Sequence, residues 1–321
     1  MSTSIVDNVC LPVSSAYSVR PPFSVTAGVR GVLEAYGKLG ALNPDAVIEA
    51  LFASGEQGAW YDPSDLSTMF QDSTGTTFVT ADGQPVGLIL DKSKGLALGA
   101  ERLVNGEFSG GSTGWTLATG WSYASGAVTH SGASPGFLGK SGPLTINKRV
   151  KIMYTITENI GARELVLLNT YWVDTVAIPT TVGTHTIYPQ ANSTDFWFYS
   201  TSTGTSLTID NISVKELAGN HASQATAASR PLYKTTGLAE YNDYDAVDDV
   251  LNTTFPSSLG SSCTVAKAVV GGSPTILTGQ TIGTSWAEST DNAGVVIVNR
   301  ALTGQETTDL TAWLTAKGAT S

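Results

Sequence analysis

The stretch Val150-Lys-Ile-Met-Tyr-Thr-Ile-Thr157 alternates between two sets of side chains, one mainly apolar and one mainly polar. Successive side chains of a β-strand point to opposite faces of its sheet. The alternate residues from Val150 to Ile156 would therefore share one face, which predicts a strand that is buried on one side. Such a half-buried strand is typical of antiparallel sheets, and it favours a β-sandwich.

The surrounding region, residues 101–217, repeats this kind of signal. Leu165 to Leu168 is a short apolar run, as in a strand buried on both faces. In Phe196-Trp-Phe-Tyr199 the two Phe side chains would face one way, and Trp197 and Tyr199 the other. Short strands between Gly, Ser and Thr turns favour an antiparallel sandwich or jelly roll for this region.

One strand of this region changes its alternation partway along. Leu207 and Ile209 share one face, whereas Ile212 and Val214 fall on the opposite parity. A shift by one residue exchanges the two faces of a strand. We therefore predict a β-bulge or kink at Asp210-Asn211.

Residues 1–100 are expected to form a mixed α/β region of short helices and turns. Asn43-Pro44 and Asp62-Pro63 each read as a helix start. Helices this short are not stable alone, so we expect the region to dock on neighbouring subunits. The predicted helical stripes are Val29, Val32, Leu33 and Tyr36; Val47, Ile48, Leu51 and Phe52; and Leu66, Met69 and Phe70; Val86 to Leu90 is a strand candidate.

Residues 218–321 are expected to form a small β-rich domain that ends in a helix. Thr303 and Glu306 have the spacing of a capping box, which marks the start of that helix. Lys317-Gly318 is a suitable end for it. The predicted apolar face of the helix comprises Leu310, Trp313 and Leu314.

The composition restricts the function classes. The net charge is −10, and no cluster of Lys and Arg is present, so the chain is a poor match for nucleic acid. We expect no signal peptide and no membrane span, because no basic segment precedes an apolar run and no long apolar run occurs. Cys10 and Cys263 are too few for a disulfide framework, and whether they pair stays open.

Several stretches, in one order along the chain, resemble segments of tailed-bacteriophage virion proteins. The resemblance extends from about residue 55 to the C-terminus. It implies a structural component of a virion, as a tail fibre, another tail part or a capsid-surface protein. The stretches are Gly55 to Asp72, Asn105-Gly-Glu-Phe108, Ile209 to Val214, Gly219 to Pro231 and Asn299 to Glu306.

Within this resemblance, residues 101–217 are similar to a galactose-binding-like carbohydrate-binding module. Asn105-Gly-Glu-Phe108 and Ile209 to Val214 stand at its two ends, with Gly114-Trp115 and His130-Ser-Gly132 between them. Tyr244 to Val250 resembles the signature that opens concanavalin-like lectin domains, and Val295 to Leu302 resembles their last strand. Residues 218–321 thus look like an abridged lectin domain, at roughly half the usual length.

The resemblance implies a tail-fibre or tail-associated protein that contributes to host-surface attachment through its carbohydrate-binding-like module. Its partners would be other virion proteins, identical subunits in a homotrimer and a host surface glycan. Its location would be the virion, assembled in the host bacterial cytoplasm. Two alternatives stay open: a capsid decoration or head-fibre protein that binds no glycan, and a polysaccharide depolymerase.

Four aromatic residues are the candidates for glycan binding, because aromatic rings stack on the apolar faces of sugars. Trp115, Trp121 and Tyr123 lie in Gly-rich, loop-like sequence, and Trp197 lies on a predicted strand. The alternative for Trp115 is a structural role at the edge of the sandwich, since large aromatic residues are usually buried.

Two acidic positions are candidates for a structural calcium. Relatives in the resembled module often hold this ion, and by position its ligands would be Glu107 and Asp210. Calcium takes six to eight oxygen ligands, so backbone carbonyls would have to supply most of the others. A denser acidic run, Asp243 to Asp249, is an alternative, although a solvated loop is the commoner outcome.

The groups that an enzyme would need are scarce. His130, His185 and His221 show no metal-binding spacing, and no nucleophile elbow or phosphate loop is present. Carboxylates are present, so paired-acid glycoside hydrolysis depends on a geometry that the sequence does not show. We expect a protein without enzymatic activity and without a cofactor.

Overall fold

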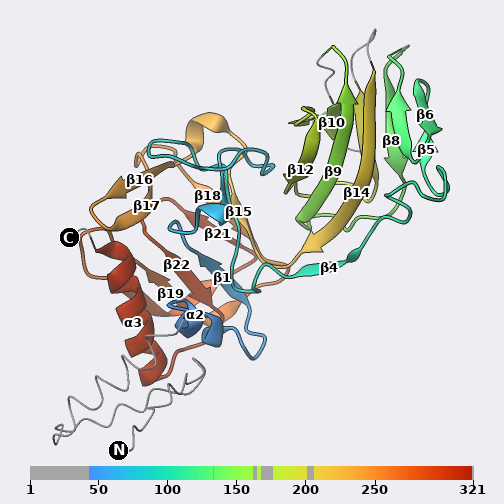
Figure 1. The fold of residues 1–321 in the computed structure, drawn as a ribbon. Coiled ribbons are helices and arrows are strands. Elements are labelled where there is room, and N and C mark those ends of the chain that lie inside the picture. The colour runs from blue at the N-terminus through green and yellow to red at the C-terminus, as the bar shows by residue number, and fades with distance from the viewer. Residues whose placement is uncertain (1–42, 133, 162–164, 168–175, 201–205, 320–321) are drawn as a thin grey trace, which may run out of the picture. The chain divides into compact units, whose positions relative to one another are not determined.

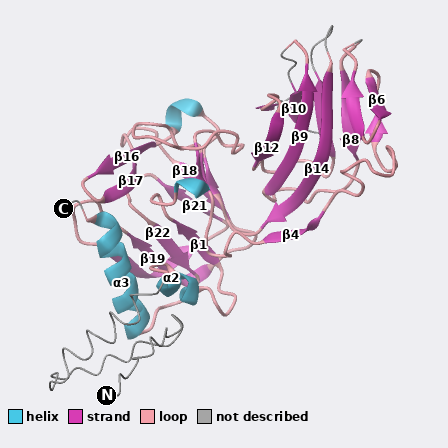
Figure 2. Ribbon diagram, viewed as in Figure 1, coloured by secondary structure: helices cyan, strands magenta, loops and turns pink. Residues whose placement is uncertain are grey.

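The computed structural model describes residues 43–132, 134–161, 165–167, 176–200 and 206–319. Strands dominate this part of the chain, and every pairing between named strands is antiparallel (Figure 1, Figure 2). The predicted class, mainly β with a C-terminal helix, is confirmed. Within the described residues, no helix has both the length and the hydropathy for crossing a membrane.

Residues 98–217 form a sandwich of two sheets, which we call the sandwich domain. The first sheet has the order β12 (Gly183–Ile187), β9 (Val150–Asn159), β14 (Leu207–Leu217), β7 (Ala127–His130) and β6 (Trp121–Ala124), with β4 (Leu98–Glu101) also paired to β14. The second has the order β11 (Val176–Ile178), β10 (Leu165–Leu167), β13 (Phe196–Ser200), β8 (Gly136–Lys140) and β5 (Thr116–Leu117).

The predicted alternation builds the core of this domain. On β9 the side chains of Ile152, Tyr154 and Ile156 are buried, and they pack in one cluster with Phe196 and Phe198 of the second sheet. Leu165 and Val166 are both buried, as expected for a strand covered on two faces. The apolar residues of both sheets therefore form a core between the sheets. The outer faces of the sheets do not contribute to this core.

The predicted irregularity at Asp210-Asn211 is confirmed. The register between β14 and β9 shifts between Asp210 and Ser213, and Asn211 has a φ of 55°. The extra residue restores Ile212 and Val214 to the core side, where Leu207 and Ile209 also lie. A short polar residue such as Asn adopts this left-handed conformation at low cost.

A second body comprises the segments on either side of the sandwich domain, residues 47–97 and 218–319, and we call it the composite domain. Its first sheet has the order β1 (Gly58–Tyr61), β22 (Val295–Val298), β19 (Gly260–Lys267) and β20 (Thr275–Ile282). Its second has the order β2 (Met69–Phe70), β3 (Leu88–Ile89), β15 (Ala222–Ser223), β18 (Leu251–Thr254) and β21 (Ser285–Glu288), and the hairpin of β16 (Leu232–Thr236) and β17 (Ala239–Asp243) stands apart from both.

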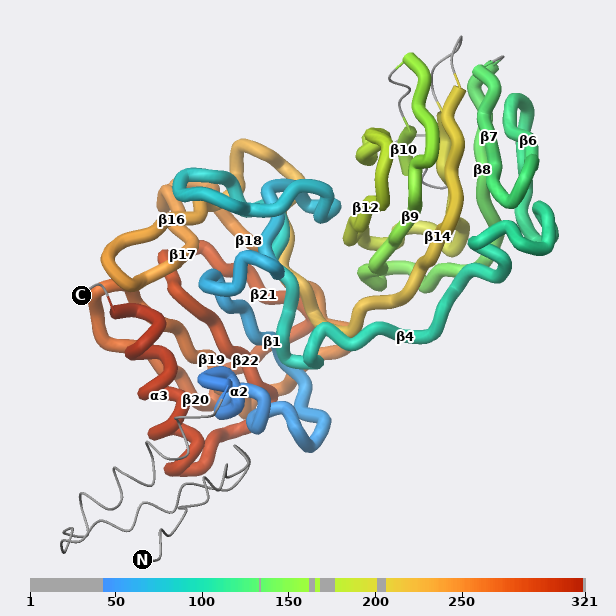
Figure 3. The backbone as a smooth tube through the Cα atoms, viewed as in Figure 1, coloured from blue at the N-terminus to red at the C-terminus, as the bar shows by residue number. Residues whose placement is uncertain are grey.

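The pairings of the composite domain join distant parts of the sequence. Gly58 to Tyr61 pair with Val295 to Val298, and Leu88-Ile89 pair with Ala222-Ser223. Residues 1–100 and residues 218–321 were predicted to form separate regions. Segments of both thus supply strands to the same sheets. Strands before residue 98 and strands after residue 218 thus form these two sheets together. In Figure 3 the chain leaves this body before β4 and returns to it after β14.

Two helices cover the outer face of the four-stranded sheet. The helix α3 (Gly304–Gly318) begins at the predicted capping box, and its buried residues include Leu310, Trp313 and Leu314. The helix α2 (Ala46–Leu51) places Ile48 and Leu51 against the same cluster. Both predicted apolar faces are confirmed, and they pack on Val296 and Val298 of β22.

The predicted helix after Asp62-Pro63 is wrong. Only a short 3-10 turn, η1 (Leu66–Thr68), forms there, and Met69-Phe70 continue as β2. Backbone pairing with β3 extends these two residues, and both side chains are fully buried. The stripe predicted from Val29 to Tyr36 lies outside the described residues.

Candidate functional site

The outer face of the second sheet of the sandwich domain carries a group of aromatic side chains. Trp197 and Tyr199 are half-buried on β13, while Phe196 and Phe198 point into the core, as the sequence predicts. Phe137 of β8 lies opposite Tyr199, and its ring contacts Trp197 edge-on at a centroid distance of 5.0 Å. We call Phe137, Trp197 and Tyr199 the aromatic face.

Gly139 leaves room for the Trp197 ring to pack flat against the neighbouring strand. Gly139 stands opposite Trp197, and a Cβ atom there would approach the ring carbon Cε3 of Trp197 to 2.5 Å. It would also meet the Phe196 carbonyl oxygen at 2.0 Å. Any larger residue would therefore have to displace the ring or the strand. Phe137 is not among the residues predicted from the sequence to bind a glycan, although Phe137 and Gly139 share a parity on their strand.

A cavity of about 270 Å³ lies beside Trp197. Asn147, Gln190 and Asn192 line it with amide groups, and Asp195 is the one carboxylate among its lining residues. Aromatic rings next to amide and carboxylate groups suit a hydroxylated ring compound, because the ring faces stack and the hydroxyls bond to the polar groups.

Trp115 and Trp121, two of the predicted glycan candidates, are core residues. Their exposed fractions are only 8% and 7%. The Trp115 indole N–H points at the carbonyl oxygens of Val104 and Asn105, at 3.2 and 3.0 Å, and that of Trp121 donates to Gly136. Satisfied and covered indoles leave no ring face for a sugar, so their roles are structural.

Tyr123 is the exposed member of the predicted set, at 39%. It lies on β6 together with Trp121, so the prediction of loop-like structure here is wrong. The hairpin pairing of β6 with β7 imposes the extended backbone. Tyr123 belongs to the first sheet, whereas Trp197 belongs to the second, so the two do not form one surface.

The role of Glu107 and Asp210 as calcium ligands stays a prediction. Glu107 is exposed, and both carboxylate oxygens of Asp210 accept hydrogen bonds from Asn211. Among the described residues, one group of three acidic side chains lies close enough to share an ion, and it consists of Asp245, Asp248 and Asp249. The Asp245 carboxylate accepts from the backbone N–H groups of Val247, Asp248 and Asp249. These contacts shape a turn and account for the cluster without an ion.

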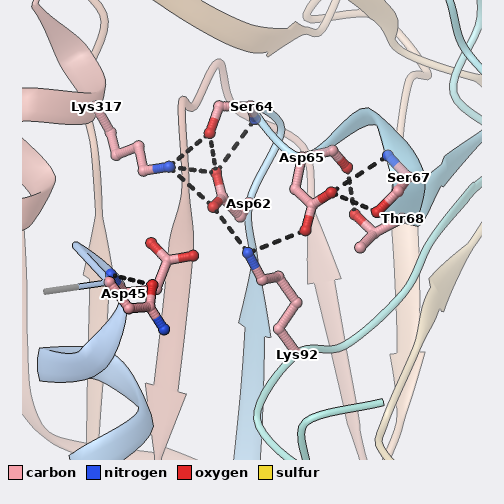
Figure 4. Close-up of polar contacts among 9 residues, drawn as sticks. Asp45, Asp62, Ser64, Asp65, Ser67, Thr68, Lys92 and Lys317 are labelled. Carbon is pink, nitrogen blue, oxygen red and sulfur yellow. Dashed lines mark hydrogen bonds and ion pairs between the residues drawn. The ribbon is translucent and has the colours of Figure 1, made fainter. Parts of the chain in front are cut away.

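Figure 4 shows a polar cluster in the composite domain that could be mistaken for an active site. The Asp62 carboxylate is 1% exposed, and both of its oxygens lie 2.9 Å from Nζ of Lys317. Lys92 Nζ lies 3.2 Å from Asp62 and 3.1 Å from Asp65. The nearby lysines hold the pKa of Asp62 below its usual value despite its burial. A carboxylate neutralised in this way fastens α3 to the sheet and is a poor proton acceptor.

Asp91 is a buried carboxylate that holds several backbone groups. It accepts from the N–H groups of Trp60, Ser93 and Asn220 at 2.7 to 2.8 Å. Burial raises its pKa to about 6, against the effect of these hydrogen bonds. The Asp91 N–H donates in turn to Nδ1 of His221 at 2.9 Å. Asp91 thereby connects the segment before the sandwich domain with the segment after it.

The other two histidines have structural surroundings. His130 is fully buried, its Nδ1 accepts from the Gly132 N–H, and its ring meets Trp121 edge-on. The His185 ring lies against Tyr154 at a centroid distance of 5.4 Å, with Nε2 2.6 Å from the carbonyl oxygen of Thr181.

No family model and no curated protein matches this sequence. Among solved structures, the chain is similar to the N-terminal tandem of two CBM22 modules from Paenibacillus barcinonensis Xyn10C, with 12% identity and a TM-score of 0.28. The match covers 65% of this chain and 94% of that chain. A likeness this distant says nothing about what the present chain binds.

Proposed function

We propose that this chain is a non-enzymatic structural component of a bacteriophage virion, a tail fibre or tail-associated protein that contributes to host attachment through glycan binding by its sandwich domain. The observation that carries the binding role is the aromatic face beside a cavity lined with amide groups. The virion role is supported by the stretches that resemble tailed-phage proteins. Homotrimeric assembly and a location in the virion are parts of this proposal.

The same cavity favours binding over hydrolysis. Glycoside hydrolysis needs two carboxyl groups on either side of the scissile bond, about 5–10 Å apart. Asp195 is the one carboxylate among the residues that line the cavity, and its Oδ1 accepts from the Gly142 N–H at 2.9 Å. A sugar held there would lack the second acid.

Glycan binding is tested by applying the purified full-length protein to an array of bacterial surface polysaccharides. We expect Trp197→Ala to reduce binding about tenfold, since a stacked aromatic ring contributes up to about 1.5 kcal/mol and about 1.4 kcal/mol corresponds to a factor of ten. The matched control is Trp286→Ala, which removes a half-buried Trp of β21 in the composite domain. Absence of binding, or equal binding by Trp197→Ala, would remove the glycan role and favour a capsid decoration or head-fibre protein.

The enzymatic alternative and the virion role have separate tests. A depolymerase would release reducing ends from the polysaccharide that binds, and we expect none. Mass spectrometry of purified tailed particles from the producing bacterium should find this chain in multiple copies. Sedimentation of the purified protein should give the mass of a trimer rather than a monomer.

A further inference from the structure

A second cavity, of about 310 Å³, is lined by cations and amides and by no carboxylate. Its lining includes Lys148 and Arg149, which directly precede β9, together with Asn147, Asn252 and His221. This volume lies at the small end of the range of about 300–1,000 Å³ for small-molecule sites. The charged residues of this lining, Arg149 and Lys148, are both cations, which is unexpected in a chain whose net charge is −10.

Arg149 is a buried cation without an ion pair. Its side chain is 6% exposed, and Nη1 donates to the carbonyl oxygens of Ser73 and Tyr188. No carboxylate of the described residues forms a salt bridge with it. Asp72 is near enough to act on its charge, but the Asp72 oxygens accept from Thr74, Thr76 and Thr77. Buried charges in proteins are normally paired or bound to an ion.

His221 adds a neutral donor to the same cavity. Its Nδ1 accepts from the Asp91 N–H, so the ring proton is on Nε2. Burial and the Arg149 charge lower the pKa of His221 to about 3, and the ring is neutral at pH 7. Nε2 is buried and has no partner at a normal hydrogen-bond distance and angle. The Leu217 backbone lies close enough to raise the pKa of His221 slightly, against the effect of burial.

The groups around these two residues are also suited to an acceptor-rich ligand. Asn252 is exposed, and no hydrogen bond of its side chain is present in the described structure. The Lys148 side chain is exposed at the rim of the cavity. Phe255 and Pro256 provide an apolar wall. Arg149, the His221 Nε2–H and Lys148 together supply donors of positive or neutral charge, which is the complement of an anionic oxygen group.

We propose that this cavity binds a small molecule through a carboxylate or phosphate group, which pairs with the Arg149 guanidinium and accepts from the His221 Nε2–H. The bound anion supplies the missing partner of Arg149. The two cavities share Asn147, Arg149, Gln190 and Ser223, whereas Trp197 lines only the first and Lys148 only the second. Variants of Trp197 and Lys148 therefore test the two proposals separately. A carboxylated sugar and a phosphate share this chemistry, and the two sources are separated by experiment.

The test is isothermal titration calorimetry of the full-length protein with glucuronate, inorganic phosphate and glucose as probes. We expect at least one anion to bind and glucose not to bind. Binding of glucuronate alone identifies a sugar acid, and binding of phosphate alone identifies a phosphate group. Lys148→Glu should weaken anion binding about tenfold, because it places a carboxylate at the rim. Lys151→Glu, a charge reversal three residues further along, on β9 and outside the cavity, is the matched control.

Arg149→Gln should abolish anion binding, and circular dichroism must show that this variant is folded. Since Lys148 is exposed, its variant gives an answer even where Arg149→Gln does not fold. Equal affinity of the Lys148→Glu and Lys151→Glu variants would overturn the proposal, as would no binding of either anion at millimolar concentration. Neither result would bear on binding to the polysaccharide array, which depends on Trp197.

Discussion

The backbone N–H of Ala218 donates a hydrogen bond of 2.9 Å to the carbonyl oxygen of Ala97. Between these two residues the chain forms the whole sandwich domain. Its first and last strands, β4 and β14, are paired side by side, which brings both ends of the domain together. The sandwich domain is therefore inserted into the composite domain, whose strands come from both sides of the insertion.

This arrangement predicts that the insertion can be removed. Deletion of residues 98–217 joins Ala97 directly to Ala218, whose backbones already meet. The two larger apolar clusters of the composite domain keep all their residues, and the smaller one around Phe70 loses Leu217 and Tyr188. We expect a soluble product that unfolds cooperatively on heating. Deletion of residues 98–190 is the control, because it leaves β13 and β14 without β8 and β9. Aggregation of the first product, or equal behaviour of the two, would refute the insertion.

Trp121 and Tyr123 should respond differently to replacement by Ala. Trp121 is buried with its N–H bonded, so Trp121→Ala should lower the free energy of unfolding by about 3–5 kcal/mol. Tyr123 is 39% exposed on the same strand, and Tyr123→Ala should cost less than about 1 kcal/mol. Urea unfolding measures both. A larger loss for Tyr123→Ala than for Trp121→Ala would contradict the assigned burial.

Asp62 should be essential for the stability of the composite domain. Its removal leaves Lys317 partly buried without its counter-charge, and losses of about 3–5 kcal/mol are typical when one partner of a buried pair is removed. Asp65 is the control, since it also meets Lys92 but is 31% exposed. We expect Asp65→Ala to cost clearly less than Asp62→Ala in urea unfolding. Similar losses would show that Asp62 is not the centre of the cluster.

The capping interaction of α3 should depend on pH. Hydrogen bonds from Arg300, and then from the Thr303 backbone, lower the pKa of Glu306 to about 2. A carboxyl whose pKa is lowered by folding stabilises the protein above its unfolded pKa, near 4.5, and loses that effect as the pH falls towards 2. Glu306→Gln should therefore destabilise the protein at pH 7 and do so less at pH 3.

The free energy of unfolding in urea is measured for the original protein and for Glu306→Gln at pH 7, 5 and 3. Glu107→Gln is a suitable control, because Glu107 is exposed. The difference between the original chain and Glu306→Gln should be nearly constant from pH 7 to 5 and smaller at pH 3. A difference that does not change between pH 5 and pH 3 would show that the ion pair with Arg300 does not contribute.

Local signals in the sequence predicted local structure well. The capping box of Thr303 and Glu306 and the bulge at Asp210-Asn211 both depend on residues a few positions apart, and both are confirmed. Met69-Phe70 had helical spacing but form a strand, since pairing with Leu88-Ile89 outweighs a weak local preference. Trp121 and Tyr123 had loop-like neighbours and form a strand for the same reason.

The alternation from Val150 to Thr157 by itself determined a half-buried strand. The alternation from Phe196 to Tyr199 determined that Trp197 points outward, because the two-residue period of a strand is a property of the backbone. The sequence could not show that Phe137 would reach Trp197, that Gly58 to Tyr61 would pair with Val295 to Val298, or that Arg149 would be buried without a carboxylate. Those facts arise from contacts between distant segments. Only the packing of whole sheets decides such contacts, because no local pattern specifies which strand lies next to which.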